Sequence, residues 1–120
     1  MISSKCKKHE AKDYLPGSWG ILTYKENDTD RTSEFNISHG GYRLSFDAKG
    51  NFTEFYRNAQ NLETTIKGTW TLENNNLQLT LVDNNPNSTE KLRVYTVVQE
   101  ITNNTFGISR DMHEYDLGKQ

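Results

Sequence analysis

Hydrophobic and polar side chains alternate with a period of two along most of this chain. Residues 65–73 give the clearest pattern, because every second side chain there is polar. The opposite face of that segment carries Ile66, Gly68, Trp70 and Leu72. A period of two is typical of a β-strand with one buried and one solvated face. No segment shows a convincing helical period, so the pattern predicts an all-β protein.

The same alternation predicts a series of strands joined by turns. We expect a hairpin between residues 42–47 and 52–57, since Gly50 in its turn can take a positive φ. Alternating apolar residues predict further strands at 19–24, 65–73, 77–81, 90–101, 106–110 and 112–117. Regularly spaced turn signals of this kind are typical of a β-sandwich or an up-and-down barrel.

Residues 25–41 are mostly polar and form a connection longer than an ordinary hairpin loop. We expect a long loop here, with a short strand around Phe35 and Ile37. By strand count, this loop lies at the same end of the molecule as the connections at 58–64 and 83–89. Such a polar rim is a candidate surface for binding another protein.

The composition narrows the class of protein. A chain of 120 residues fits one domain, and a hydrophobic content of 32 % suits strands that bury one face only. The net charge of −2 argues against a general nucleic-acid binder, which usually has a basic face. No stretch approaches the roughly 20 apolar residues of a membrane-spanning helix.

The N-terminal residues 1–13 are polar and charged and show no period, so we interpret them as a flexible tether before a domain at 14–120. Cys6, the only cysteine, excludes an internal disulfide. It follows two serines and precedes a lysine-rich spacer, so it resembles the lipidated cysteine of a bacterial lipoprotein, although Lys5 replaces the usual small residue. The alternative is an unmodified thiol in a tail. We expect an extracytoplasmic protein, tethered through Cys6, or a cytoplasmic one if no signal peptide precedes Met1.

Four motifs occur in a distinctive order. They are Leu-x-Gly-x-Trp at 15–19, Phe-Asp-x-x-Gly-x-Phe at 46–52, Gly-Thr-Trp at 68–70 and Asn-x-Leu-x-Leu at 75–79. Together they resemble the lipocalin-like domains common in Bacteroidetes. The resemblance covers roughly residues 14–117 and implies an antiparallel up-and-down β-barrel of about eight strands around a central cavity.

Strand direction places both tryptophans at one end of such a barrel. Trp19 begins the first strand, and Trp70 lies late in a strand that runs the opposite way, so both indoles would close the lower end. True lipocalins also carry an arginine over the first tryptophan. Arg110 is the obvious match, but strand counting puts it near the open rim. Either the strand count is off by one or that arginine is absent here, and we expect the second.

A ligand site should therefore lie at the open end. The inward positions there are Thr23, Tyr42, Tyr56, Thr64, Leu81, Leu92 and Arg110. Apolar walls with a few hydroxyl groups suit a small apolar or amphipathic molecule, and an arginine can hold a carboxylate through two parallel hydrogen bonds. The alternative is a barrel filled by its own side chains. The facing of residues 52–57 stays open, because Phe52, Phe55 and Tyr56 cannot all point inward.

The sequence shows no frame for catalysis or metal binding. The histidines lack His-Glu-x-x-His spacing, and no serine lies in a Gly-x-Ser-x-Gly frame. We therefore predict a monomeric binding protein that is not an enzyme and needs no cofactor or metal. The alternative function is a protein-interaction or inhibitor module with a filled barrel and a functional loop rim.

Overall fold

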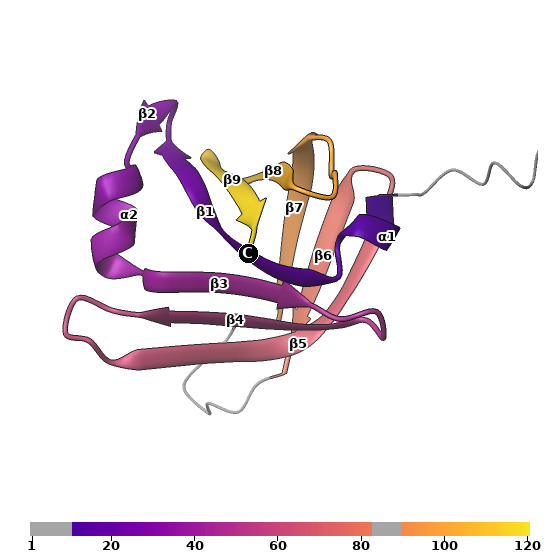
Figure 1. Ribbon diagram of the computed structural model, residues 1–120, viewed down its shortest axis with the longest axis horizontal. Coiled ribbons are helices and arrows are strands. Elements are labelled where there is room, and N and C mark those ends of the chain that lie inside the picture. The colour runs from indigo at the N-terminus through magenta and orange to yellow at the C-terminus, as the bar shows by residue number, and fades with distance from the viewer. Residues whose placement is uncertain (1–10, 83–89) are drawn as a thin grey trace, which may run out of the picture.

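The computed structural model describes residues 11–82 and 90–120, so Cys6 and the predicted connection at 83–89 lie outside the described residues. The chain forms one antiparallel sheet in the order β2-β1-β3-β4-β5-β6-β7-β8-β9, which β1 closes by also pairing with β9 (Figure 1). The strands are β1 (Gly17–Glu26), β2 (Thr29–Asp30), β3 (Gly40–Phe46), β4 (Asn51–Arg57), β5 (Glu63–Glu73), β6 (Asn76–Leu81), β7 (Leu92–Gln99), β8 (Thr105–Arg110) and β9 (His113–Lys119). The predicted eight-stranded up-and-down barrel is confirmed, with β2 as a two-residue addition at the end of β1.

The two ends of the barrel differ. We call the end with the β3–β4 and β5–β6 turns the lower end, and the opposite end, where β1, β4 and β8 finish, the upper end. In the lower turns, Gly50 has φ of 92° and Asn74 has φ of 54°, left-handed conformations that glycine and asparagine tolerate best. These two short turns fix the register of the hairpins on either side.

The lower half of the barrel is solid. Trp19 is fully buried, packs edge-on against Phe106 with ring centroids 4.6 Å apart, and donates its indole N–H to the Leu15 carbonyl at 2.8 Å. The largest fully buried side chains are Trp19, Phe52, Phe106, Leu15, Leu44, Leu77, Leu79, Ile108 and Leu117. Close packing of these side chains fills the interior of the lower half.

Trp70 also lies at the lower end, as strand counting predicts, but it is only half-buried. Its ring packs against Phe46, and its indole N–H donates to the Asp47 carbonyl at 3.0 Å. A β-carbon added at the neighbouring Gly68 would collide with the backbone carbonyl of Thr80. Glycine there lets β5 and β6 approach closely beside the indole.

A cation does cover Trp19, and it is a lysine from the last strand. The Lys119 ammonium lies 4.8 Å from the indole centroid and donates to the carbonyls of Tyr14 at 2.7 Å and Pro16 at 3.2 Å. Cation–π attraction therefore joins β9 to β1, and the two hydrogen bonds join β9 to the segment that precedes β1. Arg110 instead ends β8 at the upper end, as strand counting predicts.

The expectation of a long loop with a short strand at 25–41 is wrong in one respect. This segment contains a helix, α2 (Thr32–Ser38), and not a strand around Phe35 and Ile37. Seven residues are too few to reveal a helical period in the sequence. Phe35 is buried against Tyr24 and Tyr42, with ring centroids 4.7 and 5.3 Å away, while Ile37 stays 67 % exposed. One buried side chain thus anchors a helix where alternation with Ile37 had suggested a strand.

Helix α2 covers a side of the barrel where strand pairing is incomplete. The pairing of β1 with β3 runs only from Gly17 to Trp19, so the upper parts of these strands are separated. Figure 1 shows α2 at the start of β3, next to the β1–β2 hairpin. The helix and its buried Phe35 therefore complete the wall at the upper end.

A short helix lies at the boundary between the predicted tether and the predicted domain. Residues Ala11–Tyr14 form this helix, α1, and Ala11 and Tyr14 pack against the core. The division of the chain at residue 14 stays a prediction. Within residues 11–82 and 90–120, neither helix has the length and apolar character needed to cross a membrane.

Candidate ligand-binding site

A pocket of about 160 Å³ lies at the upper end, above the solid core and beneath α2. Its walls come from α2, the residue that follows α2, and five strands (β3, β4, β7, β8 and β9), so residues far apart in sequence meet there. They are Phe35, His39, Tyr42, Glu54, Tyr56, Arg93, Tyr95, Arg110 and Tyr115. A cavity of about 150 Å³ is known to hold one benzene molecule, so this pocket has room for about one six-membered ring.

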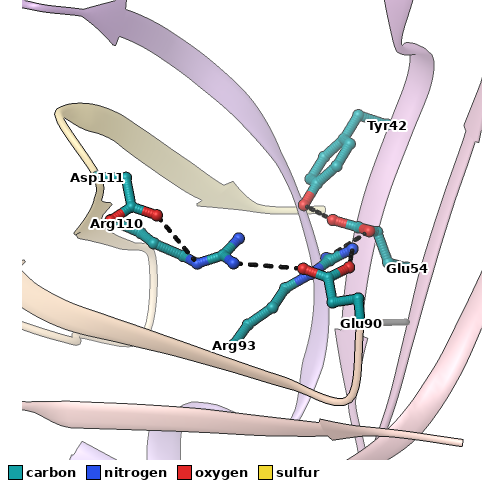
Figure 2. Close-up of polar contacts among 6 residues, drawn as sticks. All are labelled: Tyr42, Glu54, Glu90, Arg93, Arg110 and Asp111. Carbon is teal, nitrogen blue, oxygen red and sulfur yellow. Dashed lines mark hydrogen bonds and ion pairs between the residues drawn. The ribbon is translucent and has the colours of Figure 1, made fainter. Parts of the chain in front are cut away.

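A buried ion pair forms the floor of the pocket. Glu54, which is only 6 % exposed, accepts a hydrogen bond from the Tyr42 hydroxyl at 2.6 Å and another from Arg93 Nη1 at 2.8 Å (Figure 2). Each oxygen of this carboxylate thus has its own donor. A buried charge needs such a partner, because it has lost its hydration.

Glu90 links the two arginines of the pocket. Arg93 donates Nε and Nη2 to its two oxygens at 3.1 and 2.9 Å, whereas Arg110 Nη2 reaches it only at 3.3 Å. The Arg93 hydrogen bond and charge lower the pKa of Glu90, so this carboxylate stays ionised. Arg110 makes a second, looser contact with Asp111 at 3.8 Å (Figure 2). Arg93 is thus firmly held, and Arg110 is not.

Tyrosine hydroxyls dominate the remaining surface. Burial raises the pKa of Tyr42, Tyr95 and Tyr115, so these phenols stay protonated at neutral pH. Among the described residues, the hydroxyls of Tyr56 and Tyr115 have no hydrogen-bond partner, and neither oxygen is sealed from the pocket. The pocket therefore presents neutral hydroxyls that can donate to a ligand.

The ring of His39 separates this pocket from a groove on the outer side of α2. It stacks on Phe35 at 4.3 Å with an interplanar angle of 3° and lies 4.4 Å from Tyr56. Partial burial lowers the pKa of His39, since desolvation disfavours the imidazolium. A neutral, stacked imidazole thus belongs to the aromatic wall.

The structure brings together three of the seven residues predicted to bind a ligand. Tyr42, Tyr56 and Arg110 line the pocket, and the ambiguity at 52–57 resolves with Phe52 and Glu54 buried. Thr64 pairs with Tyr56, and Leu81 pairs with Gly68. Both are half-buried and do not line the pocket.

The expectation that Thr23 and Leu92 point into the barrel is wrong. In β1, the register with β9 shifts between Ile21 and Thr23, so the buried position moves from the expected Thr23 to Tyr24, which is 8 % exposed. A bulge of this kind reverses the facing of every later residue in the strand. In β7, Leu92 is 49 % exposed and Arg93 lines the pocket in its place.

The facing of β7 was misassigned because its outer row is more hydrophobic than its inner row. Leu92, Val94 and Val98 face solvent, whereas Arg93 and Tyr95 face inward. A signal for the true register was present in β4, where Glu54 shares a face with Phe52 and Tyr56. An inward carboxylate requires a cation across the barrel, and Arg93 supplies it.

A second polar cluster lies outside the pocket, where β1 meets β9. The Tyr24 hydroxyl lies 3.0 Å from Glu26 and 2.6 Å from His113 Nδ1. Burial, followed by the Glu26 hydrogen bond, raises the pKa of Tyr24 to about 12. No group of three or more histidine, cysteine or acidic side chains within 11–82 and 90–120 is placed to hold a metal ion. The cluster thus ties the two strands together at the upper end.

Comparison with known proteins agrees with this architecture. A sequence profile of the lipocalin-like domain matches residues 15–108. The chain belongs to the lipocalin-like domain family. A lipocalin-like protein from Bacteroides uniformis ATCC 8492 superimposes with a TM-score of 0.71 at 17 % identity, over 89 % of this chain and 99 % of that one.

An uncharacterized protein from Bacteroides eggerthii DSM 20697 superimposes on this lipocalin-like domain with a TM-score of 0.63 at 18 % identity, over 88 % of this chain and 99 % of that one. No curated protein matches the sequence significantly. At such low identities the structural likeness establishes the shared fold, and the side chains of the pocket must be interpreted on their own chemistry.

Proposed function

We propose that this lipocalin-like domain binds one small amphipathic ligand, about the size of a single ring, in the upper pocket. The observation that carries the proposal is a pocket of about 160 Å³ with aromatic walls and two hydroxyls, of Tyr56 and Tyr115, that lack a partner among the described residues. The lining combines aromatic rings with oriented polar groups, and a concave site with such groups is typical of small-molecule binding.

The size of the ligand follows from what lies below the pocket. Leu44, Phe52, Leu79 and Ile108 are at most 2 % exposed and fill the barrel beneath it. A long acyl chain would have to displace several of these side chains. Each displacement would cost about 1 kcal/mol or more of folding free energy. A compact ring that stays near Tyr42 and Tyr56 avoids this cost.

We further propose that the ligand is bound and released unchanged. A general base needs an accessible, unpaired acceptor near the substrate. Glu54 has its two oxygens engaged by Arg93 and Tyr42, Glu90 has both of its oxygens engaged by Arg93, and burial keeps the phenols of Tyr42, Tyr95 and Tyr115 neutral by raising their pKa. These pairings favour a binding site over a catalytic one.

A fragment screen by two-dimensional NMR tests this function. We expect single-ring fragments to give saturable shifts in the amides of Tyr42, Tyr56 and Tyr115 at the upper end. The amides of Phe106 and Leu77 in the solid lower core serve as internal controls and should not shift. A screen in which no fragment saturates, or in which shifts scatter over the outer surface, would refute the proposal.

An extracytoplasmic location with a lipid on Cys6 also remains a proposal, supported by the position of this cysteine before a lysine-rich spacer. Mass spectrometry of the natural protein tests it. We expect a diacylglyceryl-modified Cys6 in the membrane fraction, and an unmodified, free cysteine would contradict the anchor.

A further inference from the structure

The carboxylates of the pocket are already occupied. Glu54 accepts hydrogen bonds from Tyr42 and Arg93, and Glu90 accepts two from Arg93 at 2.9 and 3.1 Å. A ligand ammonium group would have to break one of these short, charge-assisted contacts to pair with either carboxylate. Neither negative charge of the pocket is therefore available to a cationic ligand.

The donors, in contrast, are only partly used. Arg110 has one long hydrogen bond to Glu90 at 3.3 Å and one loose ion pair with Asp111, whose side chain is 82 % exposed. Its Nη1 has no partner among the described residues. The guanidinium is one-third exposed and lies over the Tyr95 ring at 5.9 Å, so it is held at the pocket wall with donors to spare.

We propose that the ligand of this pocket carries a carboxylate on its ring, and that Arg110 binds this carboxylate in place of its long contact with Glu90. The inference rests on the proposed function and adds the chemical class of the ligand. A guanidinium and a carboxylate match in a planar, two-bond geometry, which suits Arg110 better than its present single bond.

Replacing the Glu90 contact of Arg110 with the ligand carboxylate leaves no charge without a partner. When the ligand takes Arg110, Glu90 keeps its two hydrogen bonds to Arg93, and Glu54 keeps Arg93 and Tyr42. The ring of the ligand then lies among the aromatic side chains. The hydroxyls of Tyr56 and Tyr115 add further donors for the same carboxylate or for a second polar group on the ring.

Fragments that share one ring and differ only in its polar group test whether the pocket prefers a carboxylate. We would titrate benzoate, benzamide and benzyl alcohol, and the corresponding members of several other single-ring series, against the wild type, Arg110→Gln and Arg57→Gln. Arg57 is the matched control, because it forms an exposed ion pair with Glu63 outside the pocket. We expect the carboxylate member to bind about tenfold or more tightly than its amide in the wild type and in Arg57→Gln, and to lose this advantage in Arg110→Gln.

A second variant predicts a change of opposite sign. Glu90→Gln removes the anion that competes for Arg110, so carboxylates should bind several-fold more tightly while amides and alcohols stay unchanged. A purely structural role for these residues would weaken all fragments alike. Equal binding of carboxylates and amides, or a preference that survives Arg110→Gln, would overturn the carboxylate and leave the pocket function standing. Absence of binding by every fragment would overturn both.

Discussion

Replacing Arg93 with methionine separates the charge of the pocket floor from its packing. Methionine keeps most of the side-chain volume, so the main loss is the guanidinium that faces Glu54 at 2.8 Å. The side chains of Arg93 and Glu54 are 12 % and 8 % exposed, so water cannot replace the lost partner. The Glu54 carboxylate would then keep only the neutral Tyr42 hydroxyl.

The expected cost follows from that burial. Breaking a buried ion pair by removing one partner costs about 3–5 kcal/mol, because it leaves an uncompensated charge in the interior. Glu90 also loses Arg93, but its side chain is 36 % exposed and recovers water, so it adds less than about 1 kcal/mol. The matched variant Arg57→Met breaks a pair that is 46 % and 59 % exposed and should cost less than about 1 kcal/mol.

Urea denaturation followed by tryptophan fluorescence measures the difference. With a slope of about 1.5 kcal/mol per molar urea, Arg93→Met should lower the midpoint by about 2–3 M. The double variant Glu54→Gln/Arg93→Met removes the stranded charge and should recover about half of the loss. A single variant as stable as Arg57→Met, or a double variant no better than Arg93→Met, would show that Glu54 is not an isolated buried charge.

Three further predictions test other parts of the structure. Gly68→Ala should cost about 3 kcal/mol or more, since its β-carbon meets a backbone carbonyl. Gly20→Ala meets the flexible ends of the Gln120 and Arg43 side chains and should cost less than about 1 kcal/mol in the same urea assay. Lys119→Met should cost about 1–3 kcal/mol, because it removes the ammonium over Trp19 and its two hydrogen bonds, and a midpoint unchanged from wild type would contradict that role. Burial lowers the pKa of His39, so as the pH falls below about 6.5 this histidine takes up a proton in the unfolded chain before it does so in the folded one. The wild type should therefore lose stability relative to His39→Phe between about pH 7 and 5. Parallel curves of stability against pH for the two proteins would refute this.

Much of the fold could be predicted from local signals. The alternation in β5, the hairpin turn at Gly50 and the turn at Asn74 each depend on neighbouring residues, and the structure reproduces all three. Helix α2 could not be predicted in the same way. Its seven residues bury one side chain, Phe35, and the reason for that burial is tertiary contact with Tyr24 of β1, Tyr42 of β3 and the distant Tyr115 of β9.

The candidate site was harder to predict, because it depends on the facing of two strands. Tyr42 and Arg110 lie in strands whose alternation is regular, and both line the pocket as expected. Thr23 was misplaced because the register of β1 with β9 shifts at Ile21, and a bulge leaves no clear sign in the sequence. Leu92 was misplaced because hydrophobicity alone favours the row of β7 that faces solvent.

The inward-facing row of β7 determines the chemistry of the pocket. Had Leu92 pointed inward, the upper end would have been a more apolar cavity, suited to a hydrophobic ligand. With Arg93 there instead, the inward Glu54 has a partner, and that pair orients Glu90 toward Arg110. A one-residue difference in facing thus places Arg93 where hydrophobicity alone predicts Leu92, and the two carboxylates of the pocket are paired as a result.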